Sequence, residues 1–146
     1  MVAWKSDPNI DDMQTVLIVS QDAEMVMVWE TLFEQKNYHV VCEAGAEDAL
    51  QTARLLSPAL IILDLDLTPS ERIGLCRELR STTGGTLLLL APKRDEAEIF
   101  EYLYAGVDEF LSTPISPLAL LVKSMAWLVR QEWIAPSGQS SQVYVL

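Results

Sequence analysis

Three aspartates stand at positions where a folded domain could place chemistry. Asp64 and Asp66 follow the apolar run LIIL, and Asp22 follows the run VLIV after two other polar residues. Carboxylate oxygens are ligands that Mg²⁺ takes in proteins, commonly from one or two side chains, with water and substrate oxygens completing the shell. Asp22 and Asp64 are therefore candidates for a weak Mg²⁺ site, while Asp22 also suits the N-cap of a helix. The sequence requires no cofactor.

The elements that must position these carboxylates follow from the hydrophobic pattern. Five short runs alternate with five longer segments whose apolar residues recur with helical spacing. The expected strands are 16–19, 38–42, 60–63, 87–90 and 109–112, and the expected helices are 23–35, 47–56, 71–81, 95–105 and 116–131. Three of the strands are continuously apolar, which indicates that helices cover both of their faces.

Strict alternation of strand and helix predicts a doubly wound α/β fold around a five-stranded parallel sheet. Ligands of such folds bind at the carboxyl ends of the strands. The positions just past the strands, where we expect the site, are Ser20, Gln21, Asp22, Asp64, Asp66, Ala91, Pro92, Thr113 and Pro114. Among these residues only the aspartates are strongly polar.

Composition narrows the classes of protein further. The 146 residues are 50% hydrophobic and carry 10 Lys or Arg against 21 Asp or Glu, a net charge of −11. This length suits one domain with a proper core, and the negative charge disfavours direct contact with nucleic acid or anionic membrane. Cys42, Cys76 and the single His39 indicate neither a disulfide framework nor a zinc site. We recognise no signal peptide or membrane span and expect a cytoplasmic protein.

The domain boundaries follow from polar and Pro/Gly/Ser-rich stretches at both ends. We expect a loose N-terminal extension over residues 1–14, the folded domain over 15–132, and a linker or tail over 133–146.

The order of the landmarks resembles the receiver domain of bacterial two-component response regulators over about residues 15–130. VLIV before a polar stretch, LIILDLDL, GVDEFL and TPIS all stand in the receiver order. The resemblance implies a flavodoxin-like (βα)5 fold with strand order 2-1-3-4-5 and Asp64 as the phosphoacceptor. It also implies Phe110 as the switch aromatic and Pro114 as the residue after a cis peptide bond. The tail resembles the join to a winged-helix DNA-binding domain, which implies an effector domain beyond Leu146.

Several positions depart from the receiver pattern. Ser20 and Gln21 stand where the resemblance places an acidic pair, Ala91 where it places a hydroxyl, and Thr113 where it places a lysine. Losing one charge-stabilising group costs roughly 10²-fold or more in rate. The loop after Asp64 is also remodelled, so Glu71 or Arg72 is a candidate to occupy the pocket.

The last expected helix carries an outer stripe of Leu118, Val122, Met125 and Val129, which predicts an interface over a tighter core. The resemblance places a dimer on the face made by the fourth helix, fifth strand and fifth helix, which adds Glu101, Tyr102, Tyr104, Glu109 and Lys123 as interface candidates.

These observations predict an atypical receiver domain that is not an enzyme. It would regulate transcription as a dimerising, protein-binding module largely independent of phosphorylation. One alternative is a working phosphoacceptor that takes phosphate from a histidine kinase on Asp64 with Mg²⁺. A second alternative, a flavodoxin-like cofactor binder, is disfavoured because the acidic residues after the first strand would repel phosphate.

Overall fold

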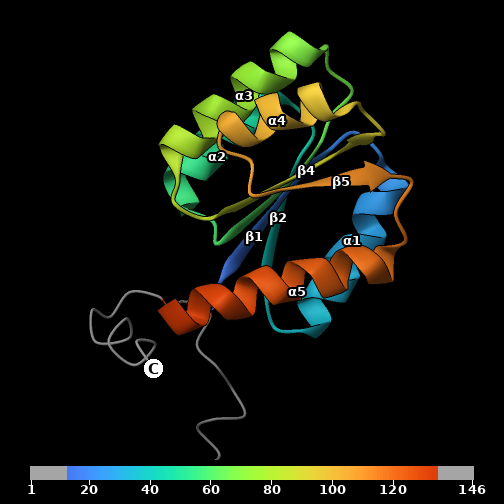
Figure 1. Cartoon of the computed structure of the whole chain (residues 1–146). Coiled ribbons are helices and arrows are strands. Elements are labelled where there is room, and N and C mark those ends of the chain that lie inside the picture. Colours follow the sequence, from blue (N-terminus) through green and yellow to red (C-terminus); the bar gives the residue numbers. More distant parts are fainter. Residues whose placement is uncertain (1–12, 135–146) are drawn as a thin grey trace, which may run out of the picture.

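The computed structural model describes residues 13–134 as alternating strands and helices (Figure 1). The strands are β1 Thr15–Ser20, β2 His39–Glu43, β3 Leu60–Asp64, β4 Thr86–Pro92 and β5 Glu109–Thr113. The helices are α1 Ala23–Gln35, α2 Ala46–Leu56, α3 Pro69–Thr82, α4 Glu96–Tyr104 and α5 Pro117–Ile134. The expectations for residues 1–12 and 135–146 lie outside the described residues.

The five strands form one parallel sheet in the order β2-β1-β3-β4-β5, which confirms the expected fold class and strand order. The register between β1 and β3 sets Ser20 directly beside Asp64. The carboxyl end of the sheet therefore collects the candidate residues at one edge.

Each expected element is present, and most differ at their ends by a few residues. Helix α3 begins at Pro69 rather than at Glu71 because Thr68 caps it. The Thr68 hydroxyl accepts from the Glu71 backbone N–H while the Glu71 carboxylate accepts from the Thr68 backbone N–H, a reciprocal capping box. Helix α5 runs three residues past its expected end.

Two apolar layers enclose the sheet, with α2, α3 and α4 on one face and α1 and α5 on the other (Figure 1). Alternate residues of each central strand enter opposite layers, so that Leu17 joins the first layer and Ile18 the second. Because both faces are covered, β1, β3 and β4 are apolar along their length, as the sequence predicted. No helix between residues 13 and 134 is both long enough and apolar enough to cross a membrane.

The two cysteines are packing residues. Cys76 is fully buried, and burial raises the pKa of its thiol to about 12. Cys42 is half-buried, and its burial together with Glu30, Glu34 and Glu43 raises its pKa to about 11. Both side chains are free thiols.

Candidate functional site

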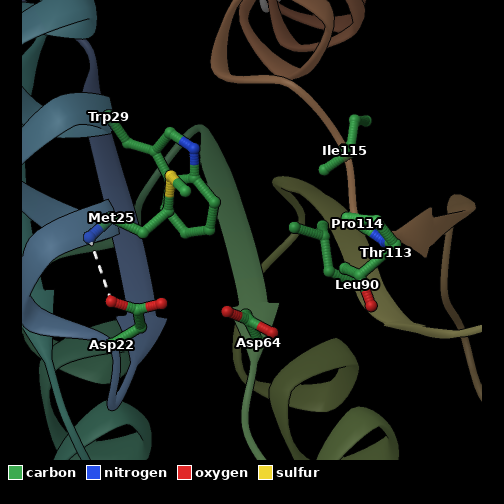
Figure 2. A pocket seen from close by; sticks show the side chains of 8 residues that line it. All are labelled: Asp22, Met25, Trp29, Asp64, Leu90, Thr113, Pro114 and Ile115. Atoms are coloured by element: carbon green, nitrogen blue, oxygen red, sulfur yellow. Dashed lines mark hydrogen bonds between the residues drawn. The ribbon is translucent and has the colours of Figure 1, made fainter.

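The structure brings Ser20, Asp22 and Asp64 together at the carboxyl ends of β1 and β3. Ser20 Oγ donates to Asp64 Oδ2 at 3.1 Å, and the Asp22 backbone N–H donates to Ser20 Oγ at 3.1 Å. Asp22 Oδ1 in turn accepts from the Met25 backbone N–H, so Asp22 is the N-cap of α1 (Figure 2). Gln21 is exposed. The Ser20 hydroxyl therefore links the Asp64 carboxylate to the backbone of Asp22, whose own carboxylate lines the same cavity.

The surroundings of Asp64 disfavour its charged form. Burial raises the pKa of Asp64 above its ordinary value, and the nearby negative charge of Asp22 adds to this rise. The hydrogen bond from Ser20 lowers the pKa, but its effect is smaller than that of burial. Within the part of the chain that the structure describes, no cation forms an ion pair with this carboxylate to lower its pKa.

The donor set at this site is limited to two carboxylates, Asp22 and Asp64, which suits only the weak Mg²⁺ site that the sequence predicted. Between residues 13 and 134 no group of three or more His, Cys, Asp or Glu side chains could hold a metal ion. Asp22 already commits one oxygen to the α1 cap, and Ser20 replaces an acidic residue with a weaker ligand.

Two cavities open on Asp64. One, of about 270 Å³, lies between α1 and the β5–α5 loop, where Figure 2 shows Asp64 between Asp22 and Thr113. The other, of about 240 Å³, is lined by Asp64, Ala91 and Thr113 together with Asp66, Arg72 and Arg94. The peptide bond between Thr113 and Pro114 is cis, as the resemblance implied.

Of the two residues expected to approach the remodelled pocket, Arg72 lines the second cavity and Glu71 does not. Arg72 is almost fully buried, with 3% of its side chain exposed. Its Nη1 donates to the Tyr102 hydroxyl at 2.9 Å and its Nη2 donates to the Leu67 carbonyl at 2.9 Å. The guanidinium thus joins the β3–α3 loop to α4.

The network continues through Tyr102. Its hydroxyl donates to Glu98 Oε2 at 2.5 Å, and its ring stacks on Phe110 of β5 with the ring centroids 6.0 Å apart. Burial and the hydrogen bond to Glu98 raise the pKa of the Tyr102 hydroxyl, although Arg72 opposes this. We call Arg72, Glu98, Tyr102 and Phe110 the Arg72 network.

Tyr102 was wrongly predicted as an interface residue, since it has no exposed surface. A tyrosine can be buried this deeply because Arg72 and Glu98 satisfy its hydroxyl. Glu98 lies one helical turn before Tyr102, which is a local signal for the pair, but Arg72 lies thirty positions away and no local pattern announces it.

The other interface candidates divide into apolar and charged residues. Leu118, Val122, Val129 and Tyr104 are exposed, while Met125 is half-buried and packs partly on the core. Glu101 is exposed on α4. Glu109 accepts from Lys123 Nζ at 2.9 Å and from Trp127 Nε1 at 2.8 Å. Burial alone would raise the pKa of Glu109, but these two hydrogen bonds hold it below its ordinary value.

The geometry first defines a class. A parallel sheet of order 2-1-3-4-5, covered on both faces and ending in an aspartate on its central strand, is a flavodoxin-like α/β domain. The family model of the response regulator receiver domain matches residues 16–124, and the chain belongs to this family. Its role is therefore that of a signalling module of two-component systems.

Comparison with known proteins agrees with this assignment. The chain is 30% identical over 125 residues to the alkaline phosphatase synthesis transcriptional regulatory protein PhoP of Bacillus subtilis, covering 85% of this chain and 52% of that protein. It is 28% identical to the DNA-binding response regulator MtrA of Mycolicibacterium paratuberculosis, covering 82% of this chain and 53% of MtrA. The chain thus spans about half the length of the curated relatives it matches.

Solved structures show the same fold. A CheY-like response regulator receiver domain protein from Methanospirillum hungatei superposes with a TM-score of 0.74 at 23% identity, covering 83% of this chain and 98% of that one. A two-component response regulator from Clostridium difficile superposes with a TM-score of 0.73 at 21% identity, covering 82% of this chain and 98% of that one.

The raised pKa of Asp64 predicts a pH-dependent effect of Asp64→Asn. The folded state disfavours the ionised carboxylate, so Asp64 destabilises the fold at pH values above its folded pKa. This penalty disappears as the pH falls toward the ordinary value of 3.8, below which both states are protonated. Asp64→Asn should therefore raise the urea midpoint at pH 7, with a gain that shrinks toward pH 4. Asp66→Asn, an exposed neighbour, controls for charge removal, and a lower midpoint for Asp64→Asn at pH 7 would contradict the argument.

The buried Arg72 network predicts a second effect on stability. Tyr102→Phe keeps the stacked ring but removes an acceptor from Arg72 and a donor from Glu98. A buried polar group left without its partner costs about 1–3 kcal/mol. The free energy of unfolding in urea should fall by that amount, and the amides of α4 should exchange faster with solvent. Tyr104→Phe on the same helix is the matched control, because Tyr104 is 88% exposed and should change stability by less than about 0.5 kcal/mol.

Proposed function

We propose that this receiver domain transmits its signal through protein contacts and dimerisation with little dependence on phosphorylation of Asp64. It regulates transcription through an effector domain outside the described residues and makes no direct contact with nucleic acid. Within the described residues, the one side chain that hydrogen-bonds the Asp64 carboxylate is the neutral Ser20. This environment is the observation that supports the proposal most.

Charge compensation is the chemical requirement that the site does not meet. Phosphoryl transfer develops negative charge on the phosphoryl oxygens, which cations must neutralise. Arg72 and Arg94 are the cations lining the cavity around Asp64. Both face Glu98, with Arg94 Nε 3.2 Å and Arg72 Nη1 4.0 Å from its Oε2. Glu98 therefore neutralises part of the positive charge of both arginines, and Thr113 contributes no positive charge.

The Arg72 network stabilises a conformation that does not require phosphorylation of Asp64. A switch needs two arrangements of similar free energy between which a signal can select. Here a buried guanidinium bonds to the loop after β3, and Tyr102 carries the connection to Phe110 on β5. These contacts favour one arrangement of α4 and β5 whether or not Asp64 is modified.

Dimerisation is assigned to the face formed by α4, β5 and α5. Phe100 and Leu103 on α4 and Leu118 and Val122 on α5 leave apolar side chains exposed. Glu109 and Lys123 neutralise each other on the same face, so they add little net charge. An exposed apolar surface of this kind commonly marks a protein interface.

A working phosphoacceptor, served by a histidine kinase, is the second candidate function. It is favoured by the placement of Arg72 and Arg94 in the same cavity as Asp64. A flavodoxin-like cofactor binder is less supported, because the Asp22 carboxylate occupies the N-terminus of α1, where a phosphate would bind. A colourless purified protein would argue further against a flavin.

Beryllofluoride, a mimic of the acyl phosphate, tests the first proposal. The ¹⁵N-labelled chain is titrated with Mg²⁺ and then with beryllofluoride, following the amides near Asp64, Ala91 and Phe110. We expect no saturable shifts at millimolar ligand in the parent chain, and the same lack of response in Asp64→Asn. Saturable shifts that reach α4 and α5 in the parent chain and vanish in Asp64→Asn would instead establish the phosphoacceptor function.

The dimer proposal predicts that Val122→Glu weakens self-association. Val122 is 62% exposed on α5, so a charge there leaves the core intact but opposes burial in an interface. The dimer dissociation constant from sedimentation equilibrium should rise at least about tenfold, or 1.4 kcal/mol. Met27→Glu is the matched control, because Met27 is an apolar residue of α1 with 67% exposure. An equal effect of both variants, or of neither, would remove this face as the dimer surface.

A further inference from the structure

A groove between α2 and α3 shares no lining residue with either cavity at Asp64. Its volume is about 430 Å³, larger than either cavity at Asp64. The two helices lie side by side on the face of the sheet opposite α1 and α5 (Figure 1). We propose that this α2–α3 groove binds a basic amphipathic helix of a partner protein.

The floor of the groove is apolar. Ala46 and Leu50 come from α2, Leu67 from the loop after β3, and Leu75 from α3. Leu75 is buried, while the other three are only partly buried against the core. A row of half-covered apolar side chains between two helices suits the apolar stripe of an amphipathic helix, which docks by inserting residues spaced three and four apart.

The rim of the groove is acidic on both sides. Glu47 of α2 and Glu78 of α3 are exposed, and within the described residues neither side-chain carboxylate has an ion pair or hydrogen bond. Glu71 keeps its charge as well, because its bonds to Thr68 lower its pKa. Three unneutralised carboxylates around an apolar floor select a basic partner and disfavour an acidic one. A second copy of this chain, with net charge −11, is a poor match.

Gly74 supplies an independent argument. It lies in the interior of the fourteen-residue α3, where glycine lowers helix stability relative to alanine. A Cβ at this position would meet no atom within 4 Å, so packing inside the chain does not require glycine. A residue without a side chain lets another backbone approach the helix closely. The bare position faces the same groove as the acidic rim.

The groove also borders the Arg72 network. Leu67 contributes its side chain to the floor, and its carbonyl accepts from Arg72 Nη2 at 2.9 Å. A helix seated in the groove therefore contacts the loop that connects Asp64 to α3, and Arg72 links this loop to α4. The basic amphipathic helix is thus one partner class for the protein contacts proposed above. Binding in the groove does not depend on that proposed function, and only its regulatory consequence rests on it.

The test uses the full chain and a synthetic peptide of about four helical turns, with leucines at helical spacing and lysines elsewhere. We expect saturable ¹⁵N shifts on α2, α3 and the loop around Leu67, and no binding by a counterpart with glutamates in place of the lysines. Gly74→Gln should raise the melting temperature, since glutamine favours the helix and meets open space, yet weaken peptide affinity at least about tenfold by filling the groove. A higher melting temperature together with weaker peptide binding would show that Gly74→Gln blocks the groove and does not disturb folding.

Charge variants provide the matched control. Glu47→Gln with Glu78→Gln should weaken binding about three- to tenfold, as expected for two exposed ion pairs. Glu30→Gln with Glu34→Gln changes the net charge equally on α1 and should leave affinity within about twofold.

Equal losses of affinity for both pairs of variants, or full peptide affinity in Gly74→Gln, would overturn the proposal. Loss of dimerisation in Gly74→Gln with no peptide binding would assign the groove to a second copy instead. None of these results depends on how Asp64 responds to beryllofluoride, so the two proposals fail separately.

Discussion

The buried guanidinium of Arg72 is the interaction on which the site end of this domain depends. A cation with almost no exposed surface must be compensated, because removing one partner of a buried ion pair costs about 3–5 kcal/mol. Leu67, Tyr102 and Glu98 supply that compensation from a loop and a helix. Since Tyr102 also stacks on Phe110, the position of one side chain constrains the loop after β3, helix α4 and strand β5 together.

Periodicity was sufficient to predict the fold class and the order of the elements along the chain. Continuous apolar runs and helical spacing are local signals, and they placed all five strands and five helices in order. Element ends were less predictable, because caps such as Thr68 act through hydrogen bonds that add a few residues. The strand order came from the family resemblance, and the sheet confirmed it.

The site was only partly predictable for a related reason. Asp64 and Asp22 stand beside strand ends, so topology alone brings them together. Arg72 and Tyr102 meet across thirty residues, and nothing in either segment specifies the partner in the other. The wrong placement of Tyr102 at an interface followed from this gap, because an aromatic residue on a surface helix looks exposed until its distant hydrogen-bond partner is known.

Two surfaces of the domain differ in chemistry. The face formed by α4, β5 and α5 carries apolar residues beside charges that neutralise each other, whereas the α2–α3 groove is bordered by carboxylates without ion pairs.

The chemistry of the two cysteines makes this domain convenient for site-specific labelling. A thiol reacts with maleimides and related reagents as its thiolate, and a pKa of about 11 leaves only about one molecule of Cys42 in ten thousand in that form at pH 7. Cys76 is both more basic and fully enclosed. A third cysteine introduced at an exposed position would therefore react far ahead of the native pair, so that a fluorophore or spin label can be attached to α4 or α2 without first replacing either native residue.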